Sequence, residues 1–171
     1  IGLLSHMLDL FAFHGFSDLT LEVKGDTHID IHHTNEDIGI ALGKAFNQAL
    51  GEDKNGIKRF GSGFAPMEDT LGHTVIDISG RGYSRVNIRG YNSEILPEVK
   101  SEEGYTLQHL EHFVESFAHQ LGATMVVRVK RSSGADLHTI METVFKSLGL
   151  ALDQATTVDP RRKGVPSTKG L

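Results

Sequence analysis

The sequence predicts an α+β fold made of two duplicated βα half-domains, each a sheet with two helices on one face. Two observations predict it. The chain matches itself at an offset of 106 residues, and each copy carries apolar residues at helical and at strand spacing. The 171 residues, of which 39% are hydrophobic and 23% charged, are enough to bury a core.

At that offset, residues 6–49 align without gaps on residues 112–155, with thirteen identities. Chance similarity between two amphipathic segments is the poorer explanation, because the identities include chemically costly residues. These are His6 with His112, Asp30 with Asp136, His32 with His138, and Glu36 with Glu142. We therefore divide the chain into a first repeat (residues 1–73), a second repeat (residues 74–157) and a C-terminal tail (residues 158–171).

Four helices are predicted from apolar residues that recur at spacings of three and four. They are residues 5–14 and 35–50 in the first repeat and residues 107–121 and 138–154 in the second. Thr34 and Asn35 are the candidate N-caps of the second helix, because their side chains can accept a backbone hydrogen bond.

Strands are predicted where apolar and polar residues alternate. They are residues 18–24 and 28–31 in the first repeat and residues 74–79, 83–90 and 124–130 in the second. Since two strands precede the second repeat's first helix, symmetry leads us to expect about 30 further residues before Ile1. Residues 92–104, rich in Glu, Ser and Gly, are expected to form an exposed loop.

Composition excludes several classes of protein. No apolar run approaches the roughly 18 residues of a membrane span, and no signal peptide is visible. The absence of cysteine excludes disulfides and thiolate metal ligands, and the net charge of −5 argues against a nucleic-acid partner. Ten histidines are unusual, and histidine commonly binds metals or transfers protons.

The histidines form a duplicated motif at the start of a predicted helix. His32-His33-x-x-Glu36 corresponds to His138-Thr139-x-x-Glu142, and His6 and His112 each stand 26 residues earlier. Helical spacing places both imidazoles of the first motif beside the Glu36 carboxylate, an arrangement that suits two ions, or one ion and a catalytic histidine. The duplication favours metal binding over a solvated helix end, and this ligand set suits Mn, Fe, Co, Ni or Zn.

The other five histidines have no duplicated counterpart and are expected on the surface or in the core. They are His14, His28, His73, His109 and His119. His14 and His28 lie near the motif in sequence, where a histidine could orient a metal ligand.

These segments together resemble the imidazoleglycerol-phosphate dehydratase family of histidine biosynthesis. The resemblance covers essentially the whole chain, in order. It rests on Ser5-His6-Met7-Leu8-Asp9, on residues 28–43, on residues 56–61, on Ala65-Pro66, on residues 77–81, on Glu111-His112-Phe113 and on residues 165–170.

The resemblance implies a ribosomal protein S5 domain 2-like fold, assembled into a shell of 24 copies with sites between subunits. It also implies two Mn²⁺ ions per subunit. The implied metal ligands are His6, His32, His33, Glu36, His112, His138 and Glu142.

The implied enzyme is a lyase that converts imidazole glycerol phosphate, a small phosphorylated imidazole substrate, to imidazole acetol phosphate. Glu142 is expected to move protons, with Glu36 as its counterpart, mainly at the metal. The implied phosphate-binding residues are Arg59, Arg81, Lys146, Ser167 and Lys169. Arginine forks match phosphate oxygens and lysine adds a point charge. The tail is expected to close over the substrate, and its Arg161, Arg162 and Lys163 to be solvated.

Several residues depart from the family's pattern. Thr139 replaces a ligand histidine and Leu137 a carboxylate, and further departures are Ser5, Leu10, Ile31, Asn35 and Gly82. A site short of one imidazole should bind fewer ions or bind them less tightly. The alternative is therefore a catalytically impaired or inactive shell-forming, metal-binding homologue, and restoring histidine at position 139 should discriminate between the two.

A phosphate-binding kinase would need a glycine-rich loop, and residues 61–66 are a poor one. The resemblance implies a cytoplasmic location, with a plastid as the alternative.

Overall fold

The computed structural model describes residues 1–52, 54–91 and 97–167, and these confirm the α+β class. The helices are α1 (Gly2–His14), α2 (Ile31–Leu50), α3 (Leu107–Leu121) and α4 (Leu137–Thr156). The strands are β1 (Phe60–Met67), β2 (Thr70–Asp77), β3 (Tyr83–Gly90) and β4 (Thr124–Arg131). No described helix is long and apolar enough to cross a membrane.

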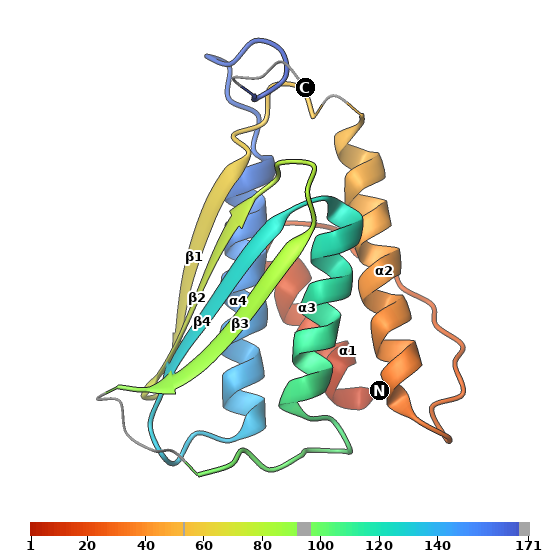
Figure 1. The fold of residues 1–171 in the computed structure, drawn as a ribbon, viewed down its shortest axis with the longest axis vertical. Helices are drawn as coiled ribbons and strands as arrows, with labels where there is room; N and C mark the ends of the chain where they lie inside the picture. The colour runs from red at the N-terminus through yellow and green to blue at the C-terminus, as the bar shows by residue number, and fades with distance from the viewer. Residues whose placement is uncertain (53, 92–96, 168–171) are drawn as a thin grey trace.

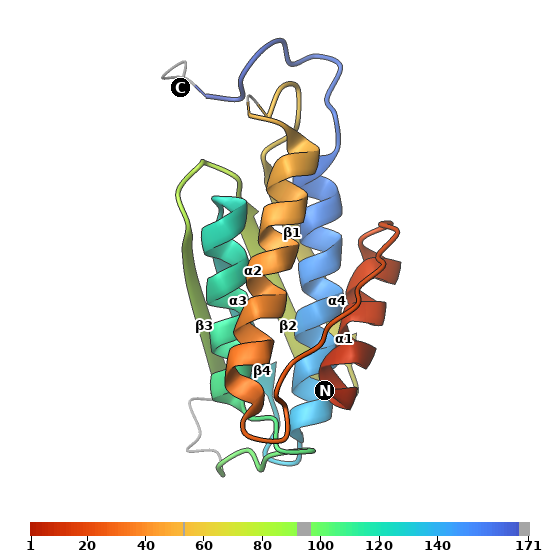
Figure 2. The same ribbon diagram turned by 90° about the vertical axis from the view of Figure 1, so that its right-hand side faces the viewer.

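The elements form three layers. α3 and α4 cover one face of the sheet, and α1 and α2 pack on them from outside (Figures 1 and 2). All four helices begin at the same end of the molecule, the lower end in Figure 1, and the tail after α4 lies at the opposite end. Residues in the first turns of different helices therefore come together at one end.

The strands lie in the order β1-β2-β4-β3. β1 and β2 form an antiparallel hairpin, β4 pairs antiparallel with β2, and β3 pairs parallel with β4 through the crossover helix α3. Side chains alternate across the sheet, and Met125, Val127 and Val129 of β4 face the helices and are buried. The other face is exposed.

Glycines let helix α4 lie directly on β1. A Cβ atom on Gly61 would lie 1.9 Å from the carbonyl oxygen of Ala151, and one on Gly63 would lie 2.2 Å from that of Ser147. α4 is the most buried helix and contributes Phe145 and Leu148 to a core that also contains Phe113 and Phe117 of α3.

The helix packing repeats at the offset found in the sequence. α3 packs on α2, and α1 packs on α4, so each half's first helix contacts the other half's second helix. A Cβ on Gly43 would lie 2.7 Å from the carbonyl oxygen of Phe117, and a Cβ on Gly149 would lie 2.5 Å from that of Phe11. Both members of the second pair are related to the first by 106 residues.

The predicted strands at residues 18–24 and 28–31 are wrong. A strand needs partners for its backbone groups. The counterpart of residues 18–24 is β4, which lies between β2 and β3, whereas no strand of the described chain pairs with 18–24. Residues 27–29 form a turn, and Asp30 caps α2, so that the helix begins at Ile31, before the predicted N-caps Thr34 and Asn35.

The second repeat is closer to prediction. The strands at 83–90 and 124–130 are confirmed, and the strand predicted at 74–79 is the later part of β2. β1 is not predicted, because Gly61, Gly63 and Pro66 are typical of a loop. Of the predicted loop, residues 92–96 lie outside the described residues. The repeat boundaries stay a prediction. The boundary that we placed between residues 73 and 74 falls inside β2.

Candidate metal centre

Two helix N-caps fix the turns that carry the histidine motifs. The Asp30 carboxylate accepts a hydrogen bond from the backbone N–H of His32 at 2.9 Å, and Asp136 accepts one from that of Thr139 at 2.8 Å. Such caps satisfy the unpaired N–H groups of a first helical turn and so define where the helix begins. The motif residues that follow are thereby held on the first turns of α2 and α4.

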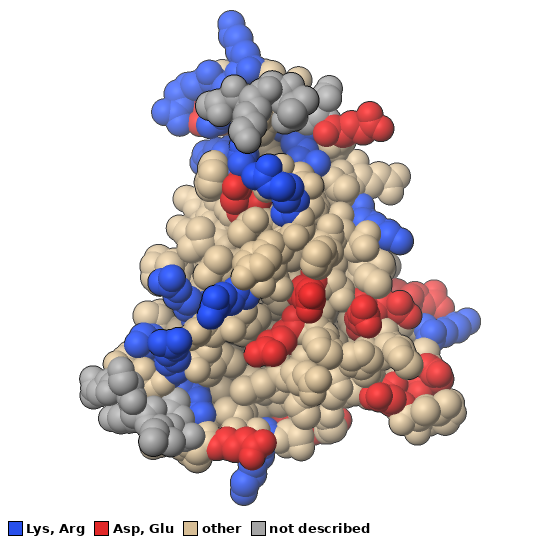
Figure 3. Space-filling view, viewed as in Figure 1, with Lys and Arg blue, Asp and Glu red and all other residues tan. Residues whose placement is uncertain are grey.

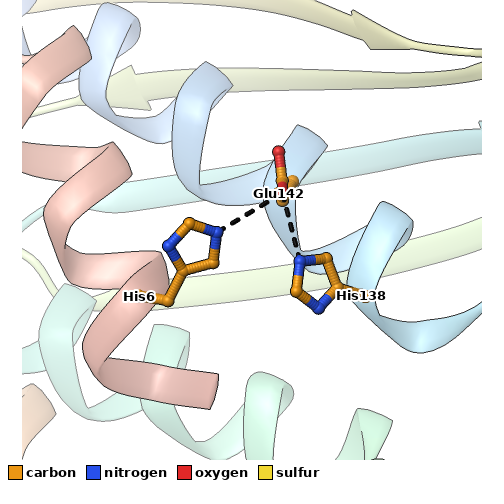
Figure 4. A group of neighbouring side chains, drawn as sticks. All are labelled: His6, His138 and Glu142. Atoms are coloured by element: carbon orange, nitrogen blue, oxygen red, sulfur yellow. Dashed lines mark hydrogen bonds and ion pairs between the residues drawn. The ribbon is translucent and has the colours of Figure 1, made fainter. Parts of the chain in front are cut away.

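The first cluster joins α1 to α4. His6 of α1, and His138 and Glu142 of α4, offer ligand atoms that all lie within 4.8 Å of one another. Glu142 Oε1 lies 3.1 Å from His138 Nε2 and 3.5 Å from His6 Nε2, with both rings directed at the carboxylate (Figure 4). In the described part of the chain, these three residues form the group of histidine and acidic side chains whose ligand atoms come close enough together to hold one metal ion.

Glu142 is held as a carboxylate. Burial alone would raise the pKa of Glu142, but the hydrogen bond and charge of Lys146, together with His6 and His138, outweigh it and leave this pKa below its ordinary value. Lys146 Nζ donates to Oε2, one helical turn after Glu142, so that Oε1 remains for the two imidazoles.

His138 is oriented from its other side. Glu102 Oε1 lies 3.0 Å from His138 Nδ1, and this hydrogen bond is the main cause of a raised His138 pKa, although partial burial opposes it. In neutral His138, the Nδ1–H donates to Glu102, and the Nε2 lone pair then faces Glu142 and His6. A carboxylate in this position fixes the tautomer of a metal-binding histidine and increases its basicity.

A second cluster joins α3 to α2 and repeats the first at the 106-residue offset. His112 of α3 lies beside His32 of α2, with 3.2 Å between their Nδ1 atoms, and Glu36 Oε2 lies 3.8 Å from His32 Nε2. This cluster borders a groove of about 380 Å³ between the two helices. His33 is exposed on the outer side of His32, with 5.5 Å between the ring centroids.

Both clusters fit a divalent cation in donor chemistry, since two imidazoles and one carboxylate are common ligands of first-row metals. They differ in geometry, because the three ligand atoms converge in the first cluster and are more spread in the second. Thr139, which is 7% exposed, and the buried Leu137 flank His138 in the sequence.

Two of the residues predicted to bind phosphate line one pocket, of about 180 Å³, at the opposite end of the molecule. These are Arg59 and Ser167. Arg59 already holds Asp77 with two hydrogen bonds, of 2.5 and 3.0 Å, and donates a third, of 2.8 Å, to the carbonyl oxygen of Pro166. These contacts pin the tail to the hairpin, and the bond to Asp77 raises the pKa of Arg59.

Of the other predicted phosphate ligands, Lys146 lies away from this pocket in the same chain. The Arg59 N–H bonds to the carbonyl of Ala155, and Lys146 lies nine residues earlier on α4, about 13 Å along the helix. Arg81 is exposed before β3, and Lys169 lies outside the described residues. Basic side chains gather over the strands and at the tail, whereas acidic ones lie mainly towards α2 (Figure 3). Arg161 pairs with Asp159 on the exposed tail.

Sequence reasoning missed Glu102 and Asp77. Glu102 falls in a segment predicted as a loop, where no periodicity relates it to His138, 36 residues later. Asp77 ends a strand and pairs with Arg59 only because β1 and β2 form a hairpin with Phe60 opposite Asp77. Both pairs depend on tertiary structure.

Comparisons with known proteins give a consistent result. The profile described as imidazoleglycerol-phosphate dehydratase matches residues 1–152. Imidazoleglycerol-phosphate dehydratases of Geobacillus kaustophilus and Bacillus subtilis are 50% and 44% identical to the chain over 171 and 177 residues. Each alignment covers 100% of this chain and 83% of the relative.

Solved structures agree. The crystal structure of imidazoleglycerol-phosphate dehydratase from Staphylococcus aureus superimposes with a TM-score of 0.77 at 32% identity and covers 93% of this chain and 84% of that one. The enzyme of Pyrococcus furiosus gives a TM-score of 0.75 at 36% identity, with 99% and 85% covered.

Proposed function

Since the chain belongs to the imidazoleglycerol-phosphate dehydratase family, we propose that it removes water from imidazole glycerol phosphate to give imidazole acetol phosphate in histidine biosynthesis. The observation that carries the proposal is the convergence of His6, His138 and Glu142 beside Lys146. The family to which the chain belongs is one of hydro-lyases.

We propose Mn²⁺ as the cofactor. His6, His138 and Glu142 would hold one ion, and His32, His112 and Glu36 a second, with His33 free to reach a neighbouring copy. A bound ion would supply Lewis acidity that makes the imidazole ring of a substrate easier to deprotonate.

The chain's own residues would position the substrate and move the protons. Glu142, kept ionised by Lys146, is the group proposed to accept a proton from carbon, and Lys146 Nζ is the adjacent donor that can return one to the leaving hydroxyl. Glu36 holds the corresponding place in the second cluster. The Arg59 guanidinium, with Ser167 beside it and with Arg81 and Lys169, would bind the substrate phosphate.

Self-association belongs to the same proposal. Arg59 and Lys146 are too far apart in one chain to hold one small substrate, whereas His33 and Arg81 are exposed and can complete a site on another copy. We propose an assembly of many copies, with 24 as the number that the family resemblance implies, located in the cytoplasm.

An impaired, metal-binding homologue is the second candidate. Thr139 and Leu137 favour it, because they remove an imidazole and a carboxylate at the centre where the chemistry takes place. Neither residue belongs to the first cluster, whose three ligand groups are His6, His138 and Glu142.

The test is the release of imidazole acetol phosphate from imidazole glycerol phosphate by the manganese-loaded protein. We expect turnover that E142Q reduces by at least about a hundredfold, the usual size of a general acid–base contribution. T139H serves as the comparison. Turnover that appears only in T139H would support the impaired homologue, and no turnover in either protein would refute the dehydratase proposal.

A further inference from the structure

A buried polar network joins α2 to the start of α3. Tyr105 donates its hydroxyl proton to Asn35 Oδ1 at 2.6 Å, and Asn35 Nδ2 donates to the carbonyl oxygen of His109 at 2.9 Å. Asn35 and Tyr105 are both 0% exposed. Burial strongly raises the pKa of Tyr105, so its hydroxyl remains a donor throughout the working pH range.

Asn35 begins a stripe along which the two helices touch. Gly39 and Gly43 follow it at four-residue spacing, and Cβ atoms on them would lie 2.8 Å and 2.7 Å from the carbonyl oxygens of Phe113 and Phe117. Glycine presents no side chain that could fix one helix along the other. The directed hydrogen bond from Asn35 supplies that restraint at the end of the stripe that carries the histidines.

Asn35 has no polar counterpart at the other helix pair. The residue 106 positions after Asn35 is Met141, and the counterpart of His109 is Leu3, both of which are buried and apolar. Apolar contact is non-directional, so it restrains sliding less than a hydrogen bond does.

We propose that Asn35 and Tyr105 are positioning residues that fix the separation of His32 and Glu36 on α2 from His112 on α3, and hence the affinity of the second cluster for a divalent cation. The proposal rests on the metal binding proposed above. Asn35 directly precedes Glu36, and His109 lies one turn before His112, so both ends of the network adjoin ligands. Metal sites tolerate misplacements of only about 0.5 Å.

The test measures Mn²⁺ affinity by competition with a chelator in variants that keep one cluster. H138A leaves the second cluster and H112A leaves the first. Y105F, which removes a single oxygen atom, is added to each of these two proteins. N35V is tested in the same way as a separate substitution. Q48A, at an exposed position of α2, is the matched control. We expect Y105F to weaken Mn²⁺ binding about tenfold in the H138A protein and less than about twofold in the H112A protein.

Equal weakening of both clusters, or a lower unfolding temperature with unchanged affinity in H138A, would overturn the proposal. If the unsubstituted protein binds no Mn²⁺, the proposed function fails separately. In that case, amide hydrogen exchange of the metal-free protein tests the positioning role of Tyr105. Faster exchange in the first turns of α2 but not of α1 in Y105F supports the positioning role, and unchanged exchange refutes it.

Discussion

Glu142, the carboxylate of the first cluster, contacts three basic side chains, because one oxygen faces two imidazoles and the other faces a lysine. The sequence predicts this residue as a ligand from the repeat alone. It does not predict that His6 meets the motif of the other half, because that depends on how the helices of the two halves cross.

The pair of His138 with Glu102 makes stability depend on pH. A raised folded-state pKa contributes stability below the unfolded pKa of about 6.5, and that contribution is lost as pH rises through the folded value. Both side chains are about one-third exposed, so we expect metal-free E102Q to lose only about 0.5 kcal/mol at pH 5.5 and nothing measurable at pH 9.

Urea unfolding at the two pH values checks this prediction, with E98Q in the same loop as the control. A deficit of equal size at both pH values would show that Glu102 acts through packing and not through the charge of His138.

At the scale of the elements, the caps and close contacts decide the boundaries. The four helices follow from apolar periodicity. The caps Asp30, Thr106 and Asp136 define where α2, α3 and α4 begin, whereas α1 has no side-chain cap. β1 is not predicted because its glycines, which allow α4 to pack closely on the strand, are read from the sequence as typical of a loop.

The cap of α4 is testable. D136A should lower the free energy of unfolding by about 1 kcal/mol at pH 7, whereas D136N, which keeps a capping oxygen, should lose much less. The hydrogen bond from Thr139 lowers the pKa of Asp136, so its ionised contribution is present above the unfolded pKa of about 3.9 and is lost as pH falls through the folded value. Unfolding by urea at pH 7 and pH 3.5 checks both statements, and an unaffected D136A would contradict them.

The contact between β1 and α4 gives a sharper prediction. G61A places a methyl group 1.9 Å from the Ala151 carbonyl, and G134A meets nothing nearer than 3.8 Å. We expect G61A to lose about 3 kcal/mol or more of unfolding free energy and G134A to lose less than about 1 kcal/mol. Similar thermal unfolding of the two variants would mean that the helix does not lie this close to the strand.

At the scale of the whole molecule, the α+β class and the candidate metal ligands could be predicted from one offset and from periodicity. The strands predicted at residues 18–24 and 28–31 were wrong because alternation alone does not supply a pairing partner. The predicted phosphate ligands could be listed but not placed, since Arg59 lies beside Ala155 near the end of α4, whereas Lys146 lies nine residues earlier on that helix.

That separation predicts self-association. Sedimentation velocity of the manganese-loaded protein should show an assembly of many copies, because the proposed site takes residues from more than one chain. A protein that sediments as a monomer while it turns over substrate would refute the proposed sharing of sites.

The most direct test of the central claim is the manganese content of the purified protein, measured by elemental analysis after chelation, reloading and desalting. The account predicts at least one retained ion per chain, held by His6, His138 and Glu142. It predicts loss of that ion in H138A but not in H73A, which changes a β2 histidine that stacks on Phe64 and belongs to neither cluster. A protein that retains no manganese, or that retains it unchanged in H138A, would contradict the account.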